Sequence, residues 1–246
     1  MECLGIDLAA QPKATAICLT EWSNSRVAIL DLRCGIGDDV LVDSMLAADK
    51  VGLDAPLGWP DDFVETIRQH HGNEASAPLP ERRLLTLRET DRALQDATGR
   101  RPLSVSTDLI GVVALRAAEL QAILSLRGAP VDRSGRGLVA EVYPAAALES
   151  WGIDASGYKS TSGKARLGEI LDQLLAGLGR IEMDEEMDSE LRRDHNQLDA
   201  LIAALAARAT ALSATNQPLP EVAERVSREG WIHVPEVPLA DLLSSA

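Results

Sequence analysis

Aromatic residues, cysteines and histidines are scarce in this chain of 246 residues. Aromatic side chains make up 3% of it, and there are three cysteines and four histidines. The cysteines, Cys3, Cys18 and Cys34, have neither metal-site spacing nor a disulfide pattern, so we expect small core residues. The histidines are likewise without the spacing of a zinc site. A disulfide-stabilised secreted fold and a zinc centre are therefore not predicted.

Long hydrophobic runs and excess positive charge are also missing. The longest apolar runs are far short of the roughly 20 residues that span a membrane. Met1-Glu2 leads directly into an apolar strand, without the regions of a signal peptide, so we expect a cytoplasmic protein. The net charge of -14 argues against indiscriminate nucleic-acid binding, although it leaves room for a local basic groove. The sequence indicates no oligomeric state.

Several well-known catalytic motifs are absent. There is no GxxxxGK[ST] phosphate loop, no complete dinucleotide fingerprint, and no support for a nucleophilic serine or cysteine with a histidine base. Gly5-Ile6-Asp7-Leu8 also fits the first strand of an actin-like phosphotransferase. The Gly/Thr phosphate-binding turn expected next is replaced by Ala9-Ala10-Gln11-Pro12, so this alternative depends on ATP binding.

The chain does contain two short apolar runs that each end in an aspartate. Cys3-Leu4-Gly5-Ile6-Asp7-Leu8-Ala9 is echoed by Val51-Gly52-Leu53-Asp54-Ala55-Pro56, with glycine, an aliphatic residue and aspartate in the same order. Side chains two apart on a strand share a face, so each glycine leaves the face beside its aspartate bare. The bare patch is either room for metal ions and substrate or a site of tight packing.

The pattern predicts an α/β fold of one domain, residues 1–246. Strands are expected at 3–9, 14–22 and 26–33 as an antiparallel meander, followed by a helix at 40–48 and strands at 50–54 and 138–143. Further helices are expected at 109–126, 144–151, 164–178 and 194–212, the last with a capping box formed by Asp194 and Gln197. The acidic stretch 182–190 is interpreted as a solvated connection, and the tail as a helix and a short strand at 230–234 without chemistry.

Residues 61–136 are interpreted as a helical insertion rich in arginine. From Glu81 to Arg136 there are ten arginines and seven acidic residues, in a chain that is otherwise strongly acidic. The pattern fits either a solvated helical face or a basic lip that contacts phosphates over the acidic edge of the sheet. Few of its residues are aromatic, so sequence-tolerant capture of a single strand is not indicated.

Four acidic residues are candidates for a metal site. Asp7, Asp54 and Glu141 lie at or near strand ends, and Asp199 lies on the last long helix. Glu141 sits between apolar neighbours, so it must lie at an exposed strand end or face cations. Carboxylates that converge repel one another unless a divalent cation binds, and oxygen ligands indicate Mg²⁺ or Mn²⁺. Two such ions about 4 Å apart align an attacking water in phosphodiester cleavage.

The order of the motifs resembles domain-of-unknown-function family 429, which is regarded as a family of predicted nucleases with a ribonuclease H-like fold. The matching segments, nearly spanning the chain, are Gly5-Ile6-Asp7-Leu8-Ala9, Asp54-Ala55-Pro56-Leu57-Gly58-Trp59-Pro60, Arg88-Glu89-Thr90-Asp91, Glu141-Val142-Tyr143-Pro144, Tyr158-Lys159 and Leu198-Asp199-Ala200-Leu201. The resemblance implies a five-stranded mixed sheet with flanking helices. It also implies a catalytic and metal-binding site of Asp7, Asp54, Glu141 and Asp199 with Lys159 nearby.

Candidate substrate-binding residues are Arg88, Asp91 and Lys13; Arg88 and Asp91 also have the spacing of a simple helical ion pair. The family pattern has an acid one turn before the helix aspartate, where this chain has Asn196. Asp194 lies about 140° around the helix from Asp199, so the second of two ions is expected to bind weakly. The sequence therefore predicts a metal-dependent nuclease acting on DNA or RNA. A non-catalytic binding or regulatory protein and an actin-like phosphotransferase are the alternatives.

Overall fold

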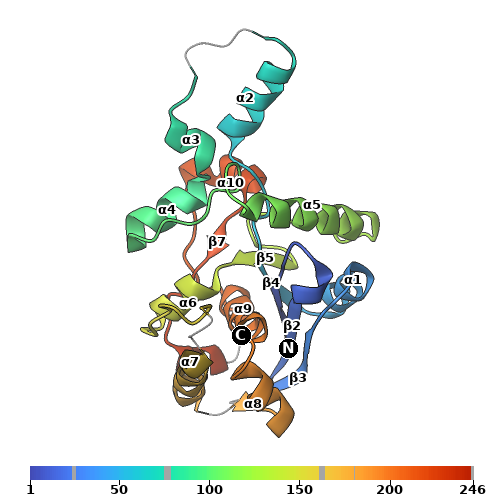
Figure 1. The fold of residues 1–246 in the computed structure, drawn as a ribbon, viewed down its shortest axis with the longest axis vertical. Coiled ribbons are helices and arrows are strands. Elements are labelled where there is room, and N and C mark those ends of the chain that lie inside the picture. The colour runs from blue at the N-terminus through green and yellow to red at the C-terminus, as the bar shows by residue number, and fades with distance from the viewer. Residues whose placement is uncertain (24–25, 75–78, 161–163, 180, 245–246) are drawn as a thin grey trace.

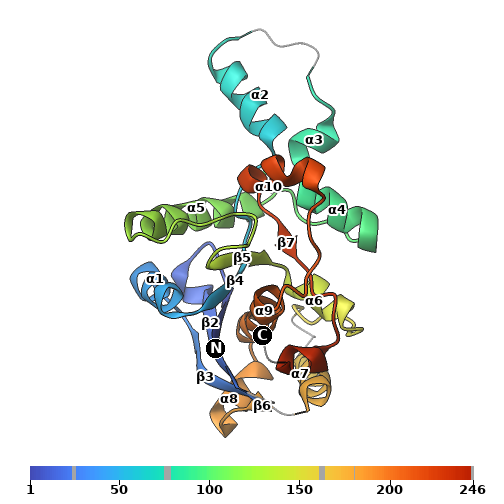
Figure 2. The ribbon, with the colours of Figure 1, turned by 180° about the vertical axis from the view of Figure 1, so that it is seen from behind.

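A computed structural model describes residues 1–23, 26–74, 79–160, 164–179 and 181–244. These residues form a seven-stranded mixed sheet with helices on both faces (Figures 1 and 2). The strands are β1 Glu2–Asp7, β2 Ala16–Ser23, β3 Arg26–Cys34, β4 Lys50–Asp54, β5 Val139–Val142, β6 Ile181–Glu182 and β7 Ile232–His233. Their order in the sheet is β6-β3-β2-β1-β4-β5-β7.

The helices of the described ranges follow and separate these strands along the chain, with α2 to α5 in succession between β4 and β5. The α-helices are α1 Asp38–Ala47, α2 Asp61–His71, α3 Arg82–Thr86, α4 Glu89–Thr98, α5 Ile110–Leu126, α6 Pro144–Ser150, α7 Lys164–Leu178, α8 Glu185–Leu191, α9 His195–Ala211 and α10 Ala223–Glu229. Short 3-10 helices occur at Pro12–Ala14, Pro220–Val222 and Leu239–Leu243. Among these helices, none has both the length and the apolar character needed to cross a membrane.

The strand directions agree with the order read from the sequence. β1 to β3 form the expected antiparallel meander, and β4 runs parallel to β1 on its other side. β5 and β7 continue the parallel half of the sheet. The sheet has seven strands rather than five because the short strands β6 and β7 extend its two edges.

The sheet separates two hydrophobic cores. Leu4 and Ile6 point to the face covered by α1 and α5, whereas Cys3 belongs to the core formed with α6, α7 and α9. This alternation follows from the two-residue period of β1. Helix α5 therefore covers the sheet itself, although it lies within the stretch interpreted as an insertion. Helices α2 and α3 extend away from the sheet (Figure 1).

The acidic stretch 182–190 differs from its interpretation as a solvated connection. It contributes to β6 and forms most of α8. Asp184 caps α8 by accepting a hydrogen bond from the Met187 N–H, and the acids of the first turn interact favourably with the helix dipole. Leu191 at the end of α8 is fully buried. Leu191, together with the partly buried Met183 and Met187, packs this short segment against the core.

Candidate active site: a carboxylate cluster at the ends of two parallel strands

Asp7 and Asp54 lie side by side because of the register of the sheet. β1 and β4 pair in parallel with Gly5 opposite Gly52 and Asp7 opposite Asp54. Both aspartates are the last residues of their strands, at the carboxyl ends, where ligands commonly bind in open α/β sheets. The prediction that two strands deliver an aspartate to one edge is confirmed.

The glycines beside these aspartates serve close packing. A Cβ atom on Gly5 would lie 2.0 Å from the Ala200 carbonyl oxygen, and one on Gly52 would lie 2.3 Å from the Ala203 carbonyl oxygen. The bare face predicted from the sequence is thus filled by the backbone of α9. This close approach places Asp199, which is fully buried on α9, at the same edge as Asp7 and Asp54.

The three aspartates form a compact group, which we call the carboxylate cluster. One oxygen atom from each of Asp7, Asp54 and Asp199 lies within 4.8 Å of the others. Tyr158 donates a hydrogen bond of 2.6 Å from its hydroxyl to Asp199 Oδ1, and Lys159 Nζ lies 2.6 Å from Asp199 Oδ2. Tyr158 is buried, while the Lys159 side chain is 48% exposed. Lys159 therefore contributes a cation at the solvent side of the cluster.

The electrostatics of the cluster favour bound protons. Burial, followed by the charges of Asp54 and Asp199, raises the pKa of Asp7 to about 8. Burial also raises the pKa of Asp54 to about 7, although Lys159 acts in the opposite direction. Burial alone would lower the pKa of Lys159, but its attraction to Asp199 and Asp54 outweighs that effect and raises it. Ionising all of these neighbouring carboxyl groups costs free energy unless a cation binds between them.

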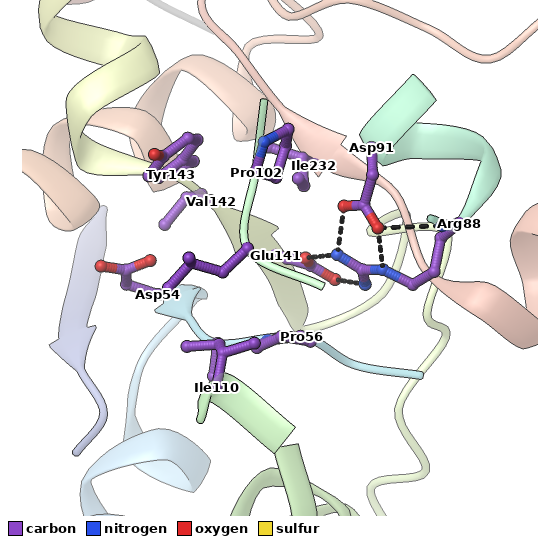
Figure 3. A pocket seen from close by; sticks show the side chains of 12 residues that line it. Asp54, Pro56, Arg88, Asp91, Pro102, Ile110, Glu141, Val142, Tyr143 and Ile232 are labelled. Atoms are coloured by element: carbon purple, nitrogen blue, oxygen red, sulfur yellow. Dashed lines mark hydrogen bonds and ion pairs between the residues drawn. The ribbon is translucent and has the colours of Figure 1, made fainter. Parts of the chain in front are cut away.

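Glu141 does not join the cluster. β5 pairs with β4 so that Glu141 lies opposite Leu53, whose side chain packs in the core under α1 and α5. Glu141 therefore points to the other face of the sheet from Asp54. Its two carboxylate oxygens accept hydrogen bonds from Arg88 at 2.7 and 2.8 Å (Figure 3). Oε2 also accepts a hydrogen bond from the Leu57 N–H. The cation that this buried glutamate requires is a guanidinium group of the chain itself.

Arg88 and Asp91, predicted as substrate-binding residues, are enclosed in the same buried network. Arg88 is 2% exposed and Asp91 is fully buried. Arg88 is the N-cap residue of α4. Asp91 accepts hydrogen bonds from the backbone N–H and from the guanidinium group of Arg88, so the two residues form the helical ion pair that the sequence offered as the alternative to substrate binding. Both side chains are closed off from solvent. Lys13 is exposed in the 3-10 helix Pro12–Ala14, in the loop that joins β1 to β2.

Sequence reasoning missed two residues of this region. Glu229 is fully buried in the tail, and its two oxygens accept hydrogen bonds from the N–H groups of Asp61 and Glu89. One carboxylate thus serves the first residues of both α2 and α4. Tyr158 was noted only as a neighbour of Lys159. The sequence shows only that Tyr158 and Lys159 are adjacent. No rule of sequence spacing predicts that either side chain contacts Asp199.

Most arginines of the basic stretch are engaged by acidic partners. Salt bridges pair Arg83 with Asp96, Arg92 with Glu89, Arg100 with Glu149, Arg116 with Asp38, Arg127 with Asp43 and Arg136 with Asp132. Arg116 is itself buried and donates to the carbonyl oxygen of Ala9, which fixes the loop after Asp7. The idea of a broad basic lip is weakened by this pairing, because surface charge that is neutralised locally attracts phosphate poorly.

The remaining sequence expectations at the site concern α9. Asp194 caps the helix by accepting a hydrogen bond of 2.9 Å from the Asn196 N–H. The capping box is not completed, because the Gln197 side chain donates to Glu190 instead of returning to the helix start. Asp194 is occupied as a cap, and the group of acids close enough to share an ion, among the residues described, contains Asp7, Asp54 and Asp199.

Comparison with known proteins identifies a family. A comparison with curated proteins and one with solved structures each gave no match. The family model described as "Protein of unknown function (DUF429)" matches residues 5–225, which is most of the chain and includes every member of the carboxylate cluster. The chain therefore belongs to domain-of-unknown-function family 429, as the order of its motifs indicated.

Proposed function

We propose that this protein is a metal-dependent hydrolase of phosphodiester bonds, a nuclease, with a ribonuclease H-like fold. The observation that carries the proposal is the carboxylate cluster, in which three aspartates from separate elements lie within 4.8 Å of one another. Such a group of like charges is costly in a buried position, and oxygen-rich sites of this kind suit Mg²⁺ or Mn²⁺. The meander β1 to β3 beside the parallel strands β4 and β5 supports the proposed fold.

The residues present fit a divalent cation. Asp7, Asp54 and Asp199 would hold it, since their oxygens converge and two of the three have a pKa raised by burial and mutual repulsion. When bound, such a cation polarises a phosphoryl oxygen and favours the ionised form of water. A second site built on Glu141 would require that residue to leave Arg88 and the opposite face of the sheet. The contacts therefore support one cation in the cluster, not a pair that includes Glu141.

The protein's own side chains have separate tasks in this proposal. Tyr158 and Lys159 hold the two oxygens of Asp199 in fixed positions. Lys159 is half exposed, so its ammonium group is also available to a phosphate that approaches the cluster from solvent. The Arg88 network, by contrast, holds α4 against β5 and takes no part in phosphate binding.

A non-catalytic binding protein on the same fold is the second candidate, and one contact favours it. Lys159 already supplies positive charge to Asp199 without any metal. An actin-like phosphotransferase is less well supported, because the loop between β1 and β2 has no glycine and carries the 3-10 helix Pro12–Ala14.

The test is isothermal titration of Mn²⁺ into the wild type and into Asp7→Asn, followed by incubation of both with labelled DNA and RNA. We expect binding and cleavage by the wild type and at least a tenfold loss of both in the variant. The control is Asp43→Asn, which alters an exposed aspartate outside the cluster and should behave as wild type. Failure of the wild type to bind Mn²⁺, alone and with an uncleavable oligonucleotide, would refute the catalytic proposal. Metal binding without cleavage would favour the second candidate.

A further inference from the structure

A small cavity opens directly beside the carboxylate cluster. It has a volume of about 100 Å³, and Asp54 contributes to its wall as well as to the cluster (Figure 3). The other residues that line it are Ala55, Pro56, Arg88, Asp91, Pro102, Leu103, Ile110, Glu141, Val142, Tyr143 and Ile232. Any group bound there lies next to the position expected for a phosphate on the cluster. We call this cavity the base pocket.

The walls of the base pocket do not suit an anionic occupant. Most of the lining side chains are aliphatic, proline or aromatic. The one cation among them, Arg88, uses all five of its N–H donors: Nε and Nη2 donate to Asp91, Nη1 and Nη2 to Glu141, and Nη1 also to the Glu229 carbonyl oxygen. Arg88 therefore has no donor left for a phosphate or carboxylate. The pocket is suited to an uncharged group with apolar faces.

The size of the base pocket limits the occupant to about one ring. Cavities that hold whole drug-sized ligands measure about 300–1,000 Å³, well above the value here. An apolar cavity that encloses one benzene ring measures roughly 150 Å³, which is more than the volume here. A base pair or a stacked pair of bases is thus too large, and a single flat ring can enter only in part, with the rest of the ring at the open side of the pocket.

We propose that the base pocket binds one unpaired nucleobase of the strand whose phosphate lies at the carboxylate cluster. This inference rests on the proposed function, and it names the substrate class more closely as single-stranded or locally unpaired nucleic acid. A nucleobase is the uncharged, planar group that a nucleic acid carries within one sugar of each phosphate. A paired base must leave its helix before it enters such a pocket, so duplexes bind less well.

Binding can be tested without cleavage in the wild type by using oligonucleotides with an uncleavable backbone. Two labelled 12-mers of equal phosphate number are compared by fluorescence anisotropy in Mn²⁺: oligothymidylate, and the same backbone with every base removed. Their equal charge cancels the salt-dependent phosphate contribution. We expect at least tenfold tighter binding of the thymine-bearing strand. An oligouridylate in parallel distinguishes RNA from DNA as the source of the base.

Variants that fill the base pocket then identify the site. Ile110→Trp changes a lining residue at the start of α5. It should reduce the discrimination, meaning the ratio of affinities for the thymine-bearing and the base-free strand, to below twofold. Leu103→Trp repeats the test at a wall residue that is 63% exposed, so that folding of the core is not at stake. The matched control is Leu115→Trp. Leu115 lies on α5, as Ile110 does, but it is 65% exposed and outside the pocket, so this variant should retain the discrimination.

Equal binding of the two strands, no binding of either, or full discrimination in both filled variants would overturn the inference. The nuclease proposal is judged separately from cleavage by the wild type. Discrimination without cleavage would refute the nuclease and retain the base pocket in a binding protein. Cleavage without discrimination would retain the nuclease and refute the base pocket.

Discussion

Asp199 illustrates how individual side chains set the properties of the site. It is fully buried, and both of its oxygens are engaged, one by the Tyr158 hydroxyl and one by the Lys159 ammonium group. A buried carboxylate that accepts one hydrogen bond and makes one ion pair is restricted in its orientation. Tyr158 therefore acts through Asp199 and is a positioning residue of the cluster, although it is not itself a metal ligand in our proposal.

Removal of the Tyr158 hydroxyl should loosen this orientation. In Tyr158→Phe, Asp199 Oδ1 loses its donor while the ring and its packing remain. We expect a roughly tenfold weaker Mn²⁺ affinity by titration, at the lower end of the effect of removing groups that orient metal ligands. A purely structural role would instead lower the melting temperature and leave the affinity of the folded protein unchanged. Tyr143→Phe, outside the cluster, serves as the control.

At the scale of elements, the contact between α9 and the sheet determines whether three carboxylates can meet. Helices normally pack on sheets through side chains, but here the backbone of α9 lies against Gly5 and Gly52, and alanines form the facing stripe. The approach is close enough for a residue as short as aspartate to reach the strand ends. The two glycines are thus as necessary for the site as the acids they precede.

This packing predicts a large effect of one added methyl group. In Gly5→Ala the new Cβ would lie 2.0 Å from the Ala200 carbonyl oxygen, so α9 must move outward and carry Asp199 with it. We expect a loss of about 3 kcal/mol in the free energy of unfolding, at the upper end for overpacked cores. Gly37→Ala, where a Cβ meets open space at a negative φ, should cost less than about 1 kcal/mol. Urea denaturation of both variants measures the difference, and equal losses would contradict the packing argument.

For the whole molecule, the sequence was a good guide wherever a local period decided the structure. The strands at 26–33 and 50–54, the helix at 109–126 and the paired aspartates follow from alternation, periodicity and a repeated Gly-x-Asp pattern. Glu141 could not be placed, because the face of a short strand depends on its register with a neighbour, and a shift of one residue reverses it. The ion pair of Arg88 with Glu141, and the hydrogen bonds that Glu229 accepts at the starts of α2 and α4, join residues from distant segments. The local periodicity of the sequence does not predict such contacts.

The pH dependence of stability is the last prediction, and it concerns the whole folded chain. The pKa of Asp7 is raised to about 8 and that of Asp54 to about 7, from 3.8, so the folded state binds these protons more tightly than the unfolded state. Their stabilising contribution is full below about pH 4 and is lost as the pH rises through 7 and 8. His233 acts in the opposite sense: its pKa is lowered to about 4 from 6.5, so its contribution is lost as the pH falls below 6.5.

Above pH 6.5 the carboxyl groups dominate, and we expect the metal-free protein to lose about 2 kcal/mol between pH 6.5 and 8.5, a fall of roughly 5 °C in melting temperature. Differential scanning calorimetry checks this against Asp7→Asn, in which the fall should be less than half as large. Mn²⁺ competes with protons for the same oxygens, so it should raise the melting temperature more at pH 8.5 than at pH 6. An equal fall of the melting temperature with pH in wild type and variant would show that the cluster does not control the pH dependence of stability, because Asp7 contributes the larger part of the expected change.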